Sequence, residues 1–351
     1  MKKHILIAPL NWGLGHATRC IPIINALIAY NFEVIIASDG NALKLLKKEF
    51  PNLITLELPS YDIEYAKKER YFKFKFLKQL PKLLKAIKLE QQYLKKIIDY
   101  YKIDGIISDN RFGVYSQKIH SVYITHQLHV LSRSTTWLTS KMHHHIIKKF
   151  HECWIPDTED KDNLSGKLGH LKHFYIPIKY LGVLSRFNKI NTKKIYDVLV
   201  LLSGPEPQRT VLEELLMKQI KKFKGNVLFV KGTVEKAQTK LKNGHITLVN
   251  FMQSDELEIA INQSEIIISR SGYTTILDLA KLGKKAFFIP TPGQFEQEYL
   301  AKRLSNKGIV PYSEQNDFTI EKLDVLKNYT GFNATENTID FDALFSLFKR
   351  E

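Results

Sequence analysis

The stretch that decides the fold runs from Ser264 to Leu304 and reads SEIIISRSGYTTILDLAKLGKKAFFIPTPGQFEQEYLAKRL. Glu265–Ser269 is a short apolar run without helical period, which predicts a strand buried on both faces. Tyr273–Leu282 has apolar residues at helical spacing, and Gly283 is typical of a helix C-cap. Ala286–Pro290 reads as the next strand, and the right-handed crossover rule makes the two strands parallel. The stretch predicts a strand–helix–strand unit of an α/β sheet.

The turn before this helix carries residues suited to an anion. Arg270, Ser271 and Gly272 turn the chain, and Gly272 lacks the Cβ that would keep a phosphate from the backbone. The N–H groups at the helix N-terminus and the helix dipole favour negative charge, and Thr274 and Thr275 add hydroxyls there. This arrangement predicts a phosphate site. A strand–helix–strand unit with an ordinary polar rim is the alternative interpretation.

Acceptors and donors for sugar hydroxyls follow the phosphate turn. Asp278 lies one helical turn further along, on the side of the two threonines, and can accept hydrogen bonds from a ribose diol. The loop after the second strand contains Gln294, Gln297 and Glu298. Together these side chains indicate a nucleotide-sugar site.

The same residues resemble the donor-binding segment of the GT-B glycosyltransferases. The resemblance is strongest to the family 28-like group that includes the lipid II-forming UDP-N-acetylglucosamine transferases and the diacylglycerol galactosyltransferases. It implies that Ser269-Arg270-Ser271-Gly272 is the phosphate turn, that Asp278 replaces a ribose-binding glutamate, and that Gln297-Glu298 replaces a glutamine pair on the sugar. Aspartate is one methylene shorter, and Glu298 replaces an amide. These departures leave the identity of the donor sugar open.

Length, composition and charge limit the classes of protein to which the chain can belong. A chain of 351 residues with 44% apolar residues suits two globular domains. No apolar run reaches the length of a bilayer span, and Cys20 and Cys153 provide no disulfide framework, which fits a reducing cytosol. The net charge of +16 calls for a polyanionic partner such as nucleotide phosphates or an anionic membrane. Because the chain is rich in Lys, Ile, Asn, Tyr and Phe together, an AT-rich genome is an alternative source of the excess lysine.

A glycine loop follows the first predicted strand, His4–Leu10. It contains Gly13 and Gly15 and ends in His16, before an amphipathic helix over Ala17–Tyr30. A GxGH loop at this place resembles the acceptor-facing loop of the same family. His16 is therefore a candidate general base, because an imidazole accepts a proton near neutral pH. A histidine that caps its own helix is the alternative.

A second candidate lies where the strand Asp104–Ser108 ends. Asp109 follows that strand, and carboxylates at the carboxyl ends of strands point into the ligand crevice of open α/β sheets. It is either a second base or the partner that orients His16. The alternative is a cap for a helix over Gly113–Ile119. After the strand Val122–Thr125, the resemblance implies that His126 and Gln127 contact the acceptor.

Histidine recurs in this half of the chain, but the pattern does not predict a metal site. Adjacent histidines on a helix cannot share a face, and few carboxylates or thiolates are near. The resemblance likewise implies metal-independent chemistry without a cofactor, with the UDP-sugar as donor substrate. The histidines concerned are His126, His129, His143, His144, His145 and His151.

The segment Lys67–Lys102 contains 12 Lys/Arg against 3 Asp/Glu, and Phe72, Phe74 and Phe76 alternate with lysines. One interpretation is an interfacial element on an anionic membrane. The other is a long core-packing helix with a solvated basic face, in which Pro81 is tolerable only near the helix start. No recognised nucleic-acid motif accompanies the charge, so nucleic acid is not an expected partner.

The second half of the chain opens after a linker at residues 186–195. Its first strand, Tyr196–Leu202, precedes Gly204, which allows close backbone approach, and Arg209, which could clamp a diphosphate. An exposed first-turn arginine is the alternative. The resemblance places the backbone of Phe251 and Met252 at the uracil edge. The expected domains are residues 1–185 and 196–335, and the resemblance implies that a terminal helix within 336–351 packs back on the first domain.

The sequence thus predicts an α/β protein of GT-B architecture, with two Rossmann-like domains whose parallel sheets face across a cleft. The expected activity is inverting transfer of a hexose or N-acetylhexosamine from a UDP-sugar to the hydroxyl of a glycan or glycolipid acceptor, in the cytoplasm or on the inner face of the cell membrane. A UDP-sugar hydrolase of nonulosonic acid biosynthesis is the first alternative. A UDP-sugar 2-epimerase is disfavoured, because its acidic pair cannot be placed. The alternative of another class is a basic, non-catalytic membrane- or nucleic-acid-binding protein.

Overall fold

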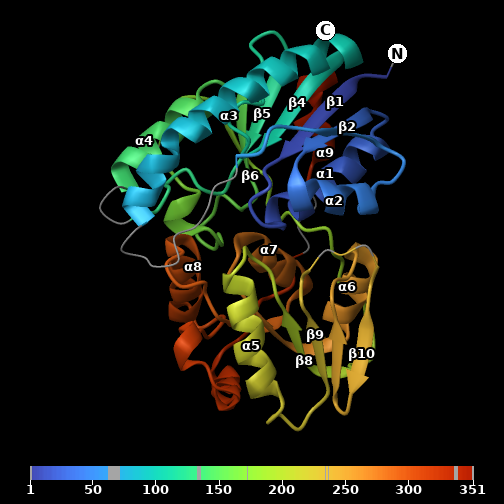
Figure 1. Cartoon of the computed structure of the whole chain (residues 1–351), viewed down its shortest axis with the longest axis vertical. Helices are drawn as coiled ribbons and strands as arrows, with labels where there is room; N and C mark the ends of the chain where they lie inside the picture. Colours follow the sequence, from blue (N-terminus) through green and yellow to red (C-terminus); the bar gives the residue numbers. More distant parts are fainter. Residues whose placement is uncertain are drawn as a thin grey trace. The chain divides into compact units, whose positions relative to one another are not determined.

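The computed structural model describes residues 2–61, 72–132, 136–171, 173–233, 235, 237–335 and 339–349, without the side chains of residues 72–80. It divides into two compact units. The first consists of Met1–Trp12, His16–Gly182 and Thr338–Glu351, and the second of Gly13–Gly15 and Val183–Asn337. Each unit is an α/β layer structure built on its own sheet (Figure 1).

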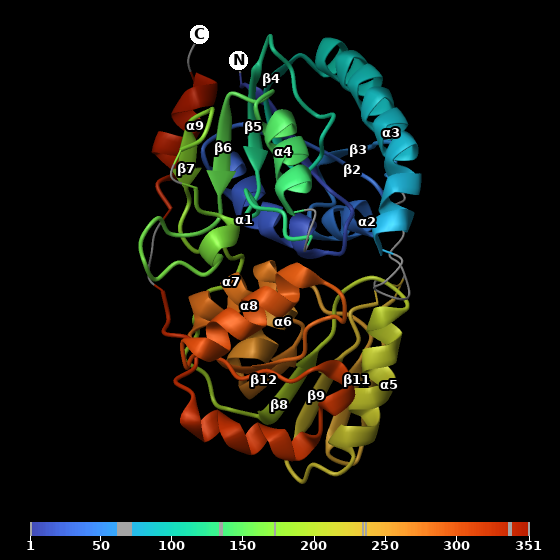
Figure 2. The same cartoon turned by 90° about the vertical axis from the view of Figure 1, so that its left-hand side faces the viewer.

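The first unit contains a parallel sheet in the order β3-β2-β1-β4-β5-β6-β7. Helices α3 and α4 lie over one face of this sheet and α1, α2 and α9 over the other (Figures 1 and 2). The elements are β1 (His4–Pro9), α1 (Gly15–Ala29), β2 (Glu33–Ser38), α2 (Gly40–Glu49), β3 (Ile54–Glu57), α3 (Phe72–Tyr101), β4 (Ile103–Asp109), β5 (His120–Ile124), α4 (Thr136–Ile147), β6 (Glu152–Ile155), a 3-10 turn (Gly166–Leu168), β7 (Ile178–Tyr180) and α9 (Phe341–Lys349).

The second unit contains a sheet in the order β10-β11-β9-β8-β12-β13, parallel except for the β10–β11 pair. Its elements are β8 (Tyr196–Leu201), α5 (Gln208–Ile220), β9 (Val227–Val230), β10 (Lys240–Asn243), β11 (Ile246–Val249), α6 (Ser254–Asn262), β12 (Ser264–Ser269), α7 (Tyr273–Leu282), β13 (Lys285–Phe288), α8 (Phe295–Asn306) and 3-10 segments at Gln315–Asp317 and Ile320–Asn328. The strand–helix–strand unit predicted from Ser264 onward is confirmed as β12-α7-β13, with Gly283 in a left-handed C-cap (φ 64°, ψ 48°).

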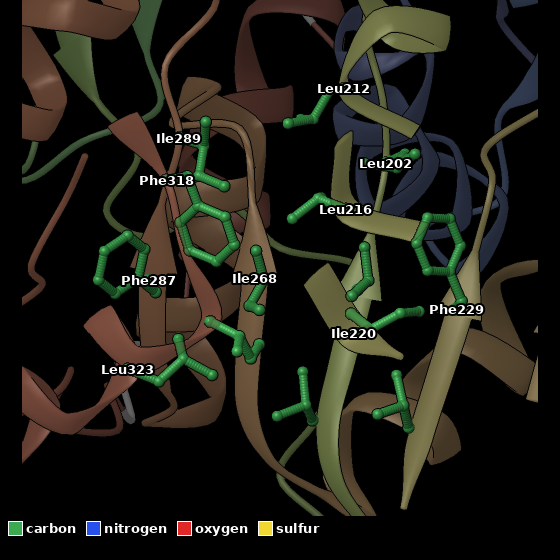
Figure 3. Packing of buried hydrophobic residues seen from close by; sticks show 14 of the residues in the cluster. Leu202, Leu212, Leu216, Ile220, Phe229, Ile268, Phe287, Ile289, Phe318 and Leu323 are labelled. Carbon is green, nitrogen blue, oxygen red and sulfur yellow. The ribbon is translucent and has the colours of Figure 1, made fainter. Parts of the chain in front are cut away.

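The core of the second unit lies between its sheet and α5. Leu212, Leu216 and Ile220 are spaced four residues apart, which puts them on one helix face. They pack against Phe229 of β9 and Ile268 of β12 (Figure 3). This packing fixes the helix that follows β8, and with it the loop at the carboxyl end of that strand.

The helix α9 returns to the sheet of the first unit. The ring of Phe345 meets the rings of Tyr30 and Phe32 edge to face, at centroid distances of 5.6 Å and 5.7 Å. The ring centroids of Phe348 and Trp154 are 6.3 Å apart. The approach depends on Gly105 in β4, because a Cβ there would collide with Phe348. The last helix of the chain therefore completes the core of the unit in which the chain begins.

Two local expectations are wrong. No helix forms over Gly113–Ile119, because the backbone there is held by α3: Glu90 accepts the Gly113 N–H (3.0 Å), and Gln91 donates to the Gly113 and Tyr115 carbonyls. The helix α3 continues through Pro81, well beyond its start.

The basic segment Lys67–Lys102 is described only in part, since residues 67–71 and the side chains before Pro81 lie outside the described residues. In the described part, Leu94 and Ile97 of α3 pack in the core, whereas Leu84 and Tyr93 are exposed. Among the helices that the structure describes, none has both the length and the apolar composition needed to cross a membrane.

Candidate functional site

In the first sheet the strand order reverses at β1. The chain moves outward from β1 to β2 and β3, then returns to the other side of β1 with β4. Ligands of open α/β sheets bind at such a switch point, beyond the carboxyl ends of the strands. Pro9 and Asp109 are paired at the ends of β1 and β4. The loop with the predicted histidine and the strand with the predicted aspartate therefore meet at this point.

The structure brings His16 and Asp109 into contact. His16 lies in the first turn of α1, and its Nδ1 is 2.7 Å from Asp109 Oδ1. The Asp109 side chain is fully buried, whereas the His16 side chain is 14% exposed. Contact through Nδ1 leaves Nε2 as the ring nitrogen available to a substrate. The geometry matches a carboxylate that orients an imidazole, one of the two roles predicted for Asp109.

A buried arginine joins this pair. Arg19 Nε donates to Asp109 Oδ2 (2.5 Å), and its NH2 group donates to Asp109 Oδ1. Burial alone would raise the pKa of Asp109, but the charge of Arg19 and the contact with His16 outweigh it and lower the pKa from 3.8 to about 2. Asp109 is therefore ionised throughout the physiological range.

The sequence analysis did not select Arg19. The signal was its position three residues after His16, which places both side chains on one helix face. A buried arginine on that face needs a carboxylate, and Asp109 was already a candidate. Its contact with Asp109 spans 90 residues of sequence, so only the strand order of the sheet could have predicted it.

The predicted acceptor residues His126 and Gln127 lie in the same region of the first unit. His126 is buried, and its Nδ1 is 3.0 Å from Arg19 NH1. Gln127 follows it, with its backbone N–H bonded to Thr125 Oγ1 (3.1 Å). In the glycine loop, Gly13 has a positive φ of 75°, which a side chain would strain, and Gly15 begins α1.

Asn110 extends the network behind the pair. It adopts a left-handed conformation (φ 57°), and its Nδ2 lies 3.5 Å from His16 Nδ1. Tyr123 Oη donates to Asn110 Oδ1 (2.9 Å) and contacts Nε2 of the buried His143 (2.9 Å). Burial lowers the pKa of His143 to about 4, with the neighbouring His144 adding to the effect. His143 is therefore neutral at pH 7.

The second sheet has its switch point between β8 and β12. The chain runs from β8 outward to β9, and the return connection places β12 on the other side of β8. Gly204, after β8, has a φ of 111°, and no atom lies within 4 Å of a Cβ built on it. Gly272 is the N-cap of α7, and a Cβ there would meet only Thr275 within 4 Å. A ligand can therefore come close to the backbone on both sides of the switch point, at Gly204 and at Gly272.

The side chains around the phosphate turn are mostly engaged with the protein itself. Arg270 is buried, and its guanidinium donates to the carbonyls of Ile289 and Pro290 (both 3.0 Å). Burial lowers its pKa to about 9. Ser271 Oγ donates to the Gln297 carbonyl (2.8 Å). In the first turn of α7 the backbone N–H groups have no acceptor within the helix, and Thr274 Oγ1 donates to the Gly15 carbonyl (3.1 Å).

The predicted sugar-binding residues shape the loop before α8. Gln297 Oε1 accepts the N–H of Thr291 (2.8 Å), and Glu298 Oε1 accepts the N–H of Gly293 (2.9 Å). Gln294 is the N-cap residue of α8, but its side chain makes no capping bond. These contacts hold the Thr291–Gly293 turn beside the end of β13.

Three further predicted residues have protein partners. Asp278 is buried in α7 and accepts a hydrogen bond from Ser185 Oγ (2.6 Å). Arg209 donates to Glu206 and Glu213 (both 2.6 Å), so the donors expected for a diphosphate clamp are already paired. The Phe251 carbonyl accepts from Gln238 (2.9 Å), and Met252 follows it before α6.

Metal ligation was not expected from the sequence. Among the described residues, no group of three or more His, Cys, Asp and Glu side chains is arranged to hold a metal ion. The adjacent histidines of α4 point to different partners, His143 to Tyr123 and His144 to the carbonyl of Leu128 (2.7 Å).

Comparison with known proteins shows what the chain resembles. Residues 207–330 match the family model of the Glycosyltransferase family 28 C-terminal domain. Over 97% of both chains, the protein is 25% identical to the UDP-N-acetylglucosamine–N-acetylmuramyl-(pentapeptide) pyrophosphoryl-undecaprenol N-acetylglucosamine transferase of Clostridium tetani. The equivalent Haemophilus ducreyi protein is 28% identical over 150 residues, and that match spans 41% of each chain.

Solved structures agree at the level of the fold. The glycotransferase of kitacinnamycin superimposes with a TM-score of 0.63 at 13% identity, covering 99% of this chain and 93% of that one. The glycosyltransferase VinC, solved with DTDP, superimposes with a TM-score of 0.60 at 13% identity, covering 99% of this chain and 100% of that one. The predicted fold class is confirmed: the chain has the GT-B fold, with two Rossmann-like α/β units built on largely parallel sheets.

Proposed function

We propose that this chain, a glycosyltransferase by its GT-B fold and its family 28 match, transfers a hexose or N-acetylhexosamine from a UDP-sugar to an acceptor hydroxyl with inversion. The observation that carries the proposal is the His16–Asp109 contact at the switch point of the first sheet (2.7 Å). A buried carboxylate on Nδ1 of a partly exposed imidazole is the arrangement that a general base requires.

In this mechanism His16 Nε2 accepts the proton of the acceptor hydroxyl as that oxygen attacks the anomeric carbon of the donor. Asp109 holds the ring through Nδ1, which leaves the lone pair on Nε2. The acceptor oxygen bonds to the anomeric carbon while the bond to the UDP oxygen breaks. A single displacement of this kind inverts the anomeric configuration.

The second unit would hold the donor. The N-terminus of α7, with Gly272, Thr274 and Thr275, offers N–H groups, hydroxyls and a positive dipole end to the diphosphate. The same groups would stabilise the charge on the departing UDP, without a metal ion or cofactor. We place the ribose at Asp278 and the uracil at the Phe251–Met252 backbone. Gln294, Gln297 and Glu298 would face the sugar.

The acceptor we favour is a lipid-linked sugar. The Clostridium tetani relative is named as acting on a pyrophosphoryl-undecaprenol substrate, and the described part of α3 combines lysines with exposed Leu84 and Tyr93. A protein that binds such a substrate would associate with the inner face of the cell membrane. Flotation with anionic vesicles at low salt tests this, because electrostatic attachment of α3 would weaken as salt rises. Absence of flotation at low salt would exclude membrane attachment.

The catalytic proposal is tested by His16→Ala, with His145→Ala on the exposed side of α4 as the matched control. A positioned general base contributes about 10²–10⁴-fold, so we expect His16→Ala to lose transfer activity on that scale while the thermal shift on UDP binding is retained. The control is expected to transfer at the wild-type rate. Full transfer activity in His16→Ala would show that His16 is not the base.

The donor itself is tested by thermal shift over UDP, GDP and TDP and their sugars. At about a hundredfold excess over Kd, a ligand that binds only the folded protein adds about 2.7 kcal/mol of stability. We expect the largest shift with UDP compounds. Release of free sugar at the full rate without an acceptor would favour hydrolysis over transfer.

A further inference from the structure

The proposed base is in contact with a cation as well as with a carboxylate. Arg19 NH2 lies 2.8 Å from His16 Nδ1, the same ring nitrogen that is 2.7 Å from Asp109 Oδ1. The guanidinium also donates to both carboxylate oxygens of Asp109, and its NH1 group faces Nδ1 of His126. Arg19 is almost fully buried, so solvent screens these interactions little.

His16 Nδ1 faces a carboxylate and a guanidinium. The carboxylate of Asp109 is only an acceptor, so it favours a proton on Nδ1 and leaves the lone pair on Nε2, the tautomer that the proposed base requires. The guanidinium of Arg19 places a positive charge 2.8 Å from the same nitrogen, so it opposes a second proton on the ring. Arg19 therefore disfavours the protonated form of His16.

The charges act in the same direction. Within the first unit, the ionisable and polar groups that face His16 are Asp109, Arg19 and Asn110, and His126 and Cys20 are the next groups in contact with Arg19 or Asp109. An ionised Asp109 alone would stabilise an imidazolium beside it. Arg19 compensates that negative charge through two hydrogen bonds. With the pair neutralised, the electrostatic reason for His16 to hold a proton is removed.

We propose that Arg19 is a positioning residue that keeps the imidazole of His16 neutral in the resting enzyme, so that Nε2 is available to accept the proton of the acceptor. This inference rests on the proposed role of His16 as general base. The carboxylate on its own would orient the ring but would also trap it in the protonated form. With Arg19 present, Asp109 still orients the His16 ring, but the positive charge of Arg19 compensates the negative charge of Asp109.

The test measures the pH profile of kcat/KM in Arg19→Met and Arg19→Lys, with Lys141→Met on the exposed face of α4 as a control for loss of a cation. A neighbouring charge shifts a pKa by about 1–3 units, so the acid limb of Arg19→Met should move to higher pH by at least about one unit. Activity would then fall by up to about tenfold for each pKa unit at pH values below the acid limb and recover at high pH. Arg19→Lys retains the charge, so its acid limb should stay near that of the wild type.

A uniform loss of activity at every pH, with an unmoved acid limb, would show that Arg19 is only structural and would overturn the inference. If Arg19→Met fails to fold because it leaves Asp109 buried without a cation, Arg19→Met/Asp109→Asn removes both charges together. In that variant the His16 pKa should lie close to the wild-type value. A large rise of the His16 pKa in this double variant would equally overturn the inference.

The His16 pKa is also measured directly, by NMR titration of ring nitrogen shifts in wild type and Arg19→Met. This readout separates the inference from the proposed function, since it does not depend on catalysis. A raised His16 pKa with unchanged transfer would support the role of Arg19 and refute His16 as the base. An unchanged His16 pKa would refute the role of Arg19, while loss of transfer in His16→Ala would still support the base.

Discussion

Asp278→Asn is expected to stabilise the protein above pH 6 and to leave its stability near pH 4 unchanged. The carboxyl is buried in α7 and accepts a hydrogen bond from Ser185 Oγ (2.6 Å). Burial raises its pKa from 3.8 to about 6, and the opposing effects of Arg186 and Ser185 reduce this rise only in part. An asparagine cannot ionise, but its Oδ1 can still accept the bond from Ser185.

The sign and size of the effect follow from proton linkage. Between pH 3.8 and about 6 the folded protein holds a proton on Asp278 that the unfolded chain has released. The free energy of unfolding therefore falls as pH rises through this window, and the loss is complete above the folded pKa. At about 1.36 kcal/mol per pKa unit, the loss amounts to about 3 kcal/mol at pH 7. Asp278→Asn should remove this pH dependence.

The assay is urea unfolding of wild type and Asp278→Asn at several pH values from 4 to 8. Asp324→Asn, at an exposed carboxyl in the second unit, is the matched control and should follow the wild-type curve at every pH. We expect the two curves for position 278 to coincide near pH 4 and to diverge up to pH 7. A difference that is the same at pH 4 and pH 8 would contradict a titrating Asp278 and would point to packing instead.

The remaining predictions concern buried contacts, each measured by the change in urea unfolding. Glu90→Ala should cost about 3–5 kcal/mol, because it leaves Arg111 buried with one carboxylate partner fewer, whereas Glu90→Gln should cost less. Phe345→Ala should cost about 3–5 kcal/mol in the first unit and Phe341→Ala less, since only Phe345 is fully buried. Gly232→Ala should be far more damaging than Gly244→Ala: both glycines have positive φ, but only at Gly232 would the Cβ collide with the Leu202 carbonyl. Equal costs within any of these pairs would refute the contact invoked for it.

The parts of the fold that could be predicted are those where local pattern and tertiary context agree. The β12-α7-β13 unit has apolar strands, helical spacing and a glycine C-cap, and each signal favours the observed element. The helix α4 has no such pattern, because its outward face carries Trp137, Leu138 and Met142 as well as polar residues. The exposed strand β10 lacks a buried face, so its sequence shows no alternation.

Where the sequence analysis was wrong, long-range contacts decided the structure. The sequence analysis considered a helix over Gly113–Ile119, but Glu90 and Gln91 of α3 bind the backbone of Gly113 and Tyr115 in an irregular conformation. The same helix continues through Pro81. Neither effect is visible in a local window of sequence.

In the candidate sites, too, local sequence pattern could be read in advance and long-range contacts could not. His16 was selected because the GxGH loop resembles the acceptor-facing loop of the family, and Asp109 because it follows a predicted strand. Arg19 was not selected, because its contact with Asp109 joins residues 90 positions apart in the sequence. For Arg209 the sequence analysis identified a cation but not the two glutamates that pair with it.

The two sheets place different electrostatics at their switch points. In the first unit a buried ion pair, Arg19 with Asp109, lies against the imidazole of His16. In the second unit, carbonyls accept from Arg270, and glutamates pair with Arg209. The N-terminus of α7 adds donors beside Gly272, because its first N–H groups have no acceptor within the helix. We infer that these backbone dipoles bind the donor diphosphate. A fixed dipole needs no reorganisation as negative charge develops on the leaving group, which is the property that stabilisation of a transition state requires.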